Sequence, residues 1–193
     1  MYLIAGLGNP GKQYEATRHN MGFDTVDCLV EKHNIPQGGV KFNAMYGKGI
    51  IGGEKSYSDE TAFLYEFKRR SDPGDVRLFQ RSIRETELIV IYDDIDLEPG
   101  QLRIRKRAVQ ADITGSRISS AALELKNLSA SVLVSVQNRK TGIWQILCWV
   151  IFSDSDRKLV DEGINDAAEA VEMILSEGVD AAMNKYNRKK PKN

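Results

Sequence analysis

Residues 3–23 read L-I-A-G-L-G-N-P-G-K-Q-Y-E-A-T-R-H-N-M-G-F, and this stretch sets the start of the fold. The apolar run 2–7 is closed by Gly, Asn, Pro and Gly, which predicts a buried strand that enters a tight loop. Beyond the loop, apolar residues recur at helical spacing from about Asn20 to Asn34, which predicts an amphipathic helix. Loops between such elements commonly carry function. Three residues of this loop have side chains suited to binding or catalysis: Asn9, Tyr14 and His19.

Further strands are predicted by three other patterns. Residues 42–51 mix apolar and small side chains and run into the glycine pair 52–53, which predicts a strand, a hairpin turn and another strand. Residues 87–92 form the clearest strand pattern in the chain. In 102–105 two apolar residues alternate with two arginines, which predicts a strand with one face on the core and a basic face outward. That basic face could contact phosphate groups.

A second helix is predicted near the end of the chain. Apolar residues form a continuous helical stripe over 160–175. Ser153 or Ser155 is the expected N-cap, and Gly178 is the expected stop.

The composition is typical of one cytosolic domain. A chain of 193 residues can bury roughly two-thirds of its unfolded surface. Lys plus Arg and Asp plus Glu both total 27, so the net charge does not indicate a polyanionic partner; the basic ending 188–193 suits RNA contact and a solvated tail equally. Cys28 and Cys148 lack the spacing of a metal or redox motif. No signal segment and no apolar run of the ~20 residues that a membrane span needs is expected.

His19 and Asp93 are the candidates for acid-base chemistry. An imidazole titrates near pH ~6.5, so His19 can accept a proton from water, although a lone histidine is more often structural. A carboxylate on the other ring nitrogen would stabilise the imidazolium. Asp93 follows the predicted strand 87–92, where α/β folds place functional groups. The surrounding Y-D-D-I-D also suits a metal cluster or a solvated acidic turn, but no histidine or glutamate of suitable spacing joins these aspartates.

Asn9 and Tyr14 are the candidates for substrate binding. The amide of Asn9 can both donate and accept hydrogen bonds, which suits recognition of a peptide group; a plain turn residue is the alternative. The ring of Tyr14 could stack on a base or sugar, or pack in the core beside the helix. The glycines of G-L-G-N-P-G are not followed by a Walker lysine pattern, and no serine or cysteine sits in a nucleophile motif, so water is the expected attacking group.

Residues 3–23 resemble, almost residue for residue, the amino-terminal signature of bacterial peptidyl-tRNA hydrolases. Residues 88–100, L-I-V-I-Y-D-D-I-D-L-E-P-G, resemble the central strand and acidic loop of that family. The resemblance implies an α/β fold, a single domain with a twisted mixed β-sheet flanked by helices, over 1–187, followed by the basic tail 188–193. It also implies a monomeric cytosolic esterase that releases tRNA from prematurely dropped peptidyl-tRNA and requires neither a cofactor nor a metal.

The resemblance also implies a role for each candidate residue. His19 is the base that activates water against the ester joining the peptide to the terminal ribose of the tRNA, and Asp93 orients its ring. Asn9 helps to distinguish a blocked aminoacyl group from a free one. Tyr14 contacts the tRNA end.

Two internal stretches, 56–85 and 108–152, do not match the family as written. They lack its two central asparagine motifs, K-P-x-x-x-M-N-L-S-G and G-x-G-G-H-N-G. Permitted codons for 59–70, read one nucleotide later, can spell M-K-P-H-F-F-M-N-L-S-G, and those for 108–117, read two nucleotides later, can spell S-A-G-G-H-N-G-L-K. We therefore infer a hydrolase gene translated out of phase in both stretches, through real insertions and deletions or through reading errors.

The alternative is a product without hydrolytic activity. Lost hydrogen-bonding groups and mismatched strands would leave an inactive frameshifted remnant, because stability margins of ~5–15 kcal/mol do not survive many such losses. A tRNA-binding protein that hydrolyses nothing is the other form of this alternative. It would keep the basic face formed by Arg103, Arg105, Lys106 and Arg107.

Overall fold

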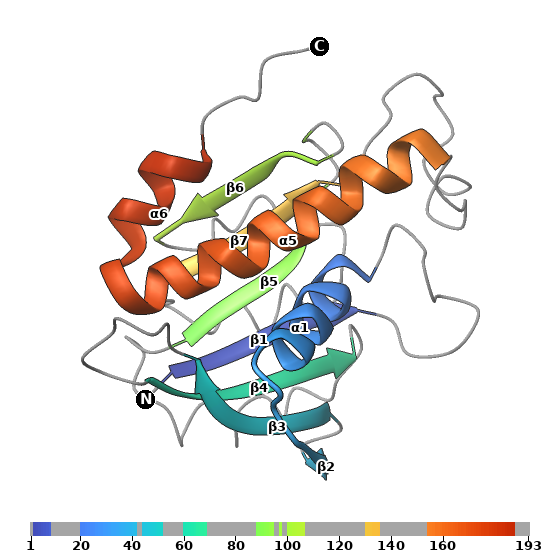
Figure 1. Ribbon diagram of the computed structural model, residues 1–193, viewed down its shortest axis with the longest axis vertical. Coiled ribbons are helices and arrows are strands. Elements are labelled where there is room, and N and C mark those ends of the chain that lie inside the picture. The colour runs from blue at the N-terminus through green and yellow to red at the C-terminus, as the bar shows by residue number, and fades with distance from the viewer. Residues whose placement is uncertain are drawn as a thin grey trace.

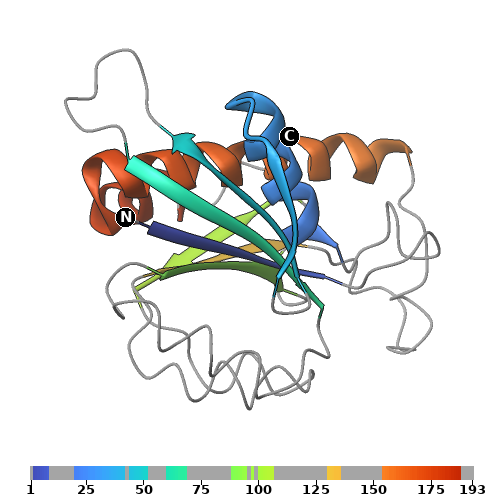
Figure 2. The same cartoon turned by 90° about the horizontal axis from the view of Figure 1, so that it is seen from below.

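The chain has an α/β fold in which a seven-stranded sheet carries the described helices on one face (Figure 1, Figure 2). The computed structural model describes residues 2–8, 20–41, 44–51, 60–68, 88–94, 97, 100–106, 130–135 and 154–187. Within these ranges, no helix combines the length and the apolar character needed to cross a membrane.

The sheet is mixed, with its parallel strands at the centre. The strands are β1 (Tyr2–Gly8), β2 (Gln37–Lys41), β3 (Ala44–Ile51), β4 (Glu60–Lys68), β5 (Leu88–Asp94), β6 (Leu102–Arg105) and β7 (Ala130–Ser135). Their order across the sheet is β2-β3-β4-β1-β5-β7-β6. Strands β4, β1, β5 and β7 are parallel to one another, while β2, β3 and β6 pair antiparallel with their neighbours. The predicted mixed sheet is therefore confirmed.

In the part of the chain that the structure describes, three helices cover one face of this sheet: α1 (Met21–Lys32), α5 (Asp154–Glu177) and α6 (Val179–Tyr186). Helix α1 ends before Asn34, whose φ of 51° leaves the helical region. Gly178, with φ of 89°, separates α5 from α6, so the predicted stop is confirmed. The suggestion of Ser155 as N-cap is wrong, because α5 begins at Asp154 and already includes Ser155.

The core lies between the helices and the sheet. Its largest fully buried side chains come from the sheet (Ile4, Ile89, Ile91, Ile104 and Val132) and from the helices (Met21, Leu29, Val160 and Ile174). Full burial of one such side chain stabilises the fold by about 1.5 to 3 kcal/mol. The helical stripe predicted over 160–175 and the apolar strand 87–92 thus meet in one interior.

Helix α1 packs so closely on the sheet that only glycine fits where their backbones meet. A Cβ atom added to Gly22 would lie 2.5 Å from the carbonyl oxygen of Ile91 and would also overlap the backbone of Leu7. A Cβ atom on Gly6 would overlap the carbonyl of Gly22. Because two glycines face each other here, the first turn of α1 rests directly on β1 and β5.

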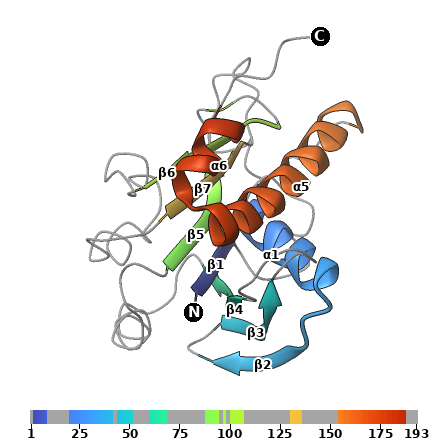
Figure 3. The ribbon, with the colours of Figure 1, turned by 60° about the vertical axis from the view of Figure 1, so that its left-hand side comes forward.

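Three described elements were not predicted from the sequence: β2, β7 and α6 (Figure 3). Strand β2 lies at the edge of the sheet, contains two glycines and leaves Val40 72% exposed, so it has little apolar signal. Strands β4 and β7 belong to the stretches 56–85 and 108–152, and they pair with β1 and β5 at the centre of the sheet. An apolar run without alternation is the pattern of such central parallel strands.

Candidate functional site

The carboxyl ends of the parallel strands gather at one edge of the sheet. Gly8, the last residue of β1, is in register with the end of β4, and Gly6 is in register with Ile91 of β5. Because β5 continues beyond Ile91, Asp93 reaches the same edge as Gly8. Open α/β sheets bind their ligands at this edge.

Asp93 is the one predicted catalytic residue that lies within the described ranges. It is the penultimate residue of β5, is in register with Val134 of β7 and has a half-buried side chain. The residues on both of its flanks belong to the end of the strand rather than to a free loop. The backbone therefore holds Asp93 at a defined place on the sheet edge.

His19, Asn9 and Tyr14 lie outside the described residues, but the chain on both sides of them is described. Asn20, which directly follows His19, is 6% exposed, and its carbonyl oxygen accepts a hydrogen bond from the backbone N–H of Asp24 at 2.8 Å. This bond belongs to the turn that packs on β1 and β5.

Gly8, which directly precedes Asn9, packs under the same turn of α1. A Cβ atom at Gly8 would lie 2.7 Å from the ring of Phe23. Gly8 and Asn20, the described residues on either side of 9–19, therefore lie at the edge of the sheet that carries Asp93.

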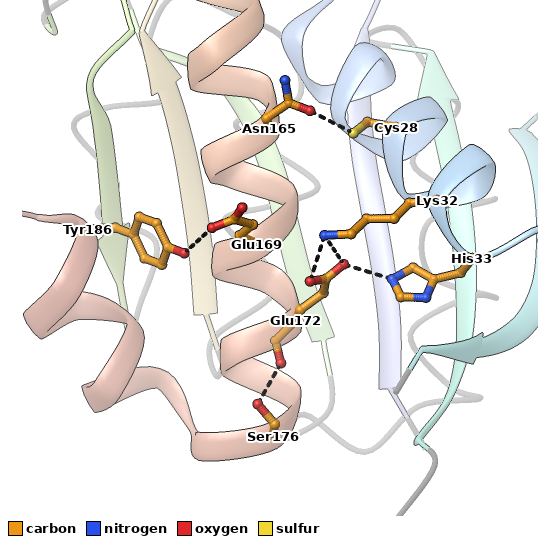
Figure 4. A network of polar contacts seen from close by, with 8 residues as sticks. All are labelled: Cys28, Lys32, His33, Asn165, Glu169, Glu172, Ser176 and Tyr186. Atoms are coloured by element: carbon orange, nitrogen blue, oxygen red, sulfur yellow. Dashed lines mark hydrogen bonds and ion pairs between the residues drawn. The ribbon is translucent and has the colours of Figure 1, made fainter. Parts of the chain in front are cut away.

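Helices α1 and α5 lie side by side and run in the same direction. The Sγ atom of Cys28 contacts Oδ1 of Asn165 at 3.5 Å, and Glu172 binds Nζ of Lys32 at 2.9 Å and Nε2 of His33 at 2.8 Å (Figure 4). Since the residue numbers rise together on both helices, their amino-terminal ends lie at the same end of the pair. That end is the strand edge just described.

Asp24, in the first turn of α1, has an unusual environment. Burial raises the pKa of its carboxyl group from 3.8 to about 6, and the nearby positive charge of Arg157 on α5 opposes this rise. The negative charges of Asp27 and Asp161 raise it further. In the sequence Asp24 looks like any acidic residue in a first helical turn, where it interacts with the helix dipole. Nothing in the local pattern indicated its burial.

The predicted alternation of β6 is confirmed. Leu102 and Ile104 are 8% and 0% exposed, respectively, and pack in the core under the helices. The pleat turns Arg103 and Arg105 to the opposite face, where both are partly exposed. Arg107 and the tail 188–193 lie outside the described residues.

The surroundings of β6 come from α6 and the residue after it. The Nζ atom of Lys106 forms an exposed ion pair with Asp180 at 2.8 Å. The side-chain amide of Asn187 accepts a hydrogen bond from the N–H of Ile104 at 2.7 Å and donates one to its carbonyl oxygen at 3.0 Å. At this edge of the sheet, the side chain of Asn187 therefore forms the two backbone hydrogen bonds that a neighbouring strand would otherwise form.

Metal binding finds no support in the described part of the chain. There, no three His, Cys, Asp or Glu side chains gather in an arrangement that could hold an ion.

Comparison with known proteins identifies the family. The sequence model of the family described as "Peptidyl-tRNA hydrolase" matches residues 3–193. The peptidyl-tRNA hydrolase of Agathobacter rectalis is 38% identical over 189 residues, which is 97% of this chain and 100% of that protein. The corresponding protein of Clostridium acetobutylicum is 36% identical over 192 residues, 97% of this chain and 98% of its own.

Solved structures resemble the fold. An Arg119Gln mutant of the peptidyl-tRNA hydrolase from Acinetobacter baumannii has a TM-score of 0.82 and 24% sequence identity, and the match covers 100% of this chain and 97% of that one. The range matched by the family model runs through both 56–85 and 108–152. By the match of its whole length and its identity to these relatives, the chain belongs to the peptidyl-tRNA hydrolase family.

Proposed function

We propose that this chain hydrolyses the ester bond of peptidyl-tRNA, releasing free tRNA and peptide, with His19 as the general base. The reaction follows from membership of the family. The roles of individual residues rest on one observation in particular. The turn of α1 that begins directly after His19 packs on the ends of β1 and β5, at the edge that carries Asp93.

The chemistry needs only these groups and water. One ring nitrogen of His19 takes a proton from water, and the hydroxide attacks the ester carbonyl. The tetrahedral intermediate collapses, the bond to the ribose oxygen breaks, and the imidazolium returns its proton to that oxygen. Asp93 holds the opposite ring nitrogen and stabilises the imidazolium while it exists. No cofactor takes part.

Substrate recognition divides between the loop and the basic strand. The amide of Asn9 recognises the blocked amino group, and the ring of Tyr14 contacts the tRNA end. Arg103 and Arg105 face away from the helices, on a surface suited to phosphate groups.

The domain assignment and the cellular setting complete the proposal. We take 1–187 as the hydrolase domain and 188–193 as a basic tail, and we expect a cytoplasmic monomer.

The frameshift explanation of 56–85 and 108–152 stays a prediction. If the codons there do not spell the missing motifs in another phase, that explanation is refuted.

The test is hydrolysis of an N-blocked aminoacyl-tRNA by the whole chain. Replacing a general base typically lowers the rate by about 10² to 10⁴, so His19→Ala is expected to lose nearly all activity and Asp93→Asn a large part of it. The sequence has two histidines, which makes His33→Gln the matched control. His33 binds Glu172 between the helices, and its replacement should leave kcat nearly unchanged.

The opposite results would refute the proposed function. Equal rates for the unmodified chain and His19→Ala would exclude hydrolysis at this site. Retained tRNA binding without hydrolysis would then support the non-hydrolytic alternative. Equal losses for both histidine variants would mean that the effect comes from folding and not from catalysis.

A further inference from the structure

Asn187, the residue that directly follows α6, binds strand β6 through its side chain. Its Oδ1 atom accepts a hydrogen bond from the N–H of Ile104 at 2.7 Å, and its Nδ2 atom donates one to the carbonyl oxygen of Ile104 at 3.0 Å. Strand β6 is the last in the strand order, so Asn187 occupies the edge of β6 that β7 does not. Both bonds are partly buried, and water competes with them less than at an exposed surface.

These two bonds fix the backbone on both sides of Ile104. Its N–H belongs to the peptide group that joins it to Arg103, and its carbonyl belongs to the peptide group that joins it to Arg105. The side chain of Ile104 is 0% exposed and packs in the core. Because a peptide group is planar, fixing both groups also fixes the directions in which the two arginine side chains leave the strand.

The ion pair between β6 and α6 cannot replace this contact. The Nζ atom of Lys106 lies 2.8 Å from the carboxylate of Asp180, but the two side chains are 58% and 73% exposed. Solvent and salt therefore screen their attraction. Lys106 also follows the last residue of the strand, so this pair leaves the peptide groups beside Ile104 untouched.

Asn187 is itself held in a defined place. Its backbone N–H donates to the carbonyl oxygen of Met183 at 3.1 Å, which closes the last turn of α6. The hydroxyl group of Tyr186, the preceding residue, donates to Glu169 of α5 at 3.0 Å (Figure 4). Ala182 of α6 is fully buried in the core. The end of α6 is therefore bound to α5 on one side and to β6 on the other.

The two arginines begin close to the functional edge of the sheet. Leu102 of β6 and Asp93 of β5 are both in register with Val134 of β7, so they lie two strand spacings apart, about 10 Å. Arg103 and Arg105 follow Leu102 as the strand runs away from this edge. Their position suits phosphate groups that follow a terminal ribose bound at the edge.

We propose that Asn187 is a positioning residue for tRNA binding, whose amide holds β6 so that Arg103 and Arg105 present their guanidinium groups to phosphates of the tRNA. The inference rests on the proposed function, in which this face of β6 contacts phosphate. Alternate residues of a strand lie roughly 6.6 Å apart on one face, so the backbone sets the spacing of the two side chains. Asn187 itself does not contact the tRNA.

A pre-organised pair of arginines binds more tightly than a mobile pair. An edge strand that must be ordered on binding loses conformational entropy, and this loss reduces the affinity. Removing the amide of Asn187 should therefore weaken tRNA binding by about three- to tenfold. It should leave the chemical step nearly unchanged, because the reacting groups are not held by β6.

The experiment measures the dissociation constant of the whole chain for uncharged tRNA, together with kcat and KM on N-blocked aminoacyl-tRNA. Asn187→Ala is expected to raise the dissociation constant and KM by about three- to tenfold, with kcat nearly unchanged. The matched control is Asn165→Ala, which removes an exposed amide from α5. It should change either constant by less than about twofold.

Two further measurements separate positioning from damage to the fold. In a chain that already carries Arg103→Ala and Arg105→Ala, adding Asn187→Ala should weaken tRNA binding little further, because the amide acts through these arginines. An N-blocked aminoacyl ester of adenosine has no phosphate groups. Asn187→Ala should hydrolyse this ester at the rate of the unmodified chain.

Three results would overturn the inference. They are an unchanged dissociation constant in Asn187→Ala, an equally large loss of binding in the chain without the two arginines, and an equal loss of rate on the adenosine ester. Failure of the proposed function is distinguishable, because it appears as equal rates for the unmodified chain and His19→Ala. The dissociation constant for uncharged tRNA is measured without hydrolysis and reports on Asn187 in either case.

Discussion

The stability of the fold should rise when the charge of Asp24 is removed, and the gain should depend on pH. The ordinary pKa of an aspartate is near 3.8, and burial raises that of Asp24 to about 6. Each pH unit between folded and unfolded pKa corresponds to about 1.4 kcal/mol, so the ionised carboxylate costs up to about 3 kcal/mol of unfolding free energy. Arg157 already reduces this cost, since its attraction is included in the pKa.

The direction follows from proton binding. The folded chain holds the proton of Asp24 more tightly than the unfolded chain does. The protonated group therefore contributes no penalty below about pH 3.8, and the penalty grows as the pH rises and is complete above about pH 6. The amide that Asp24→Asn introduces cannot ionise at any pH. Because a buried amide retains some desolvation cost, we expect this variant to raise the free energy of unfolding by about 1 to 3 kcal/mol near neutral pH and by almost nothing near pH 4.

The assay is urea unfolding followed by circular dichroism at several pH values. Glu31→Gln, which removes an equal charge from an exposed position of α1, is the control and should change stability by less than about 0.5 kcal/mol. A loss of stability in Asp24→Asn near neutral pH would refute the reasoning. An equal gain in the free energy of unfolding near pH 4 and near neutral pH would also refute it, because that gain would not come from ionisation of Asp24.

Three further changes test the packing around the site. Gly22→Ala should destabilise the fold by about 1 to 3 kcal/mol, because the added methyl group overlaps the backbone of two strands; a chain that unfolds at an unchanged urea concentration would contradict the close approach. Asn187→Ala should remove about 1 to 2 kcal/mol and speed amide hydrogen exchange at Ile104, whose N–H it caps; unaltered exchange would show that the cap is not formed in solution. Glu172→Gln should cost about 1 kcal/mol or less, and a double-mutant cycle with Lys32→Met should show a weak, salt-sensitive coupling, since both side chains are partly exposed. A coupling insensitive to salt would exclude a screened ion pair.

Local pattern was enough to predict the elements whose one face is buried. The alternation in β6 is matched by buried Leu102 and Ile104, and the stripe over 160–175 is matched by the buried face of α5. In each case burial imposes the period of the element on the sequence. Strands β2 and β7 and helix α6 were not predicted because they lack this signal. Strand β2 is glycine-rich and exposed, the apolar run of β7 does not alternate, and α6 is eight residues long with Ala182 as its buried residue.

The candidate site likewise contains residues that the sequence indicated and one that it did not. The motif around His19 and the strand that carries Asp93 near its end were recognisable from adjacent residues, and the structure brings Asp93 to the edge where the chain neighbours of His19 lie. Contact between the two side chains stays a prediction, since His19 is outside the described ranges. Asp24 could not have been selected, because its neighbour Arg157 is more than a hundred residues away in the chain.

Residue identities alone were enough to establish the family, the reaction and most of the strands and helices, because each of these depends on residues close together along the chain. Only the tertiary structure determines the order of the strands, the position of the amino-terminal ends of α1 and α5 at one edge of the sheet, and the raised pKa of Asp24. This is because a free energy of ionisation depends on the solvent and charge that surround a group after folding. Segments distant in sequence supply those surroundings, and no local pattern records them.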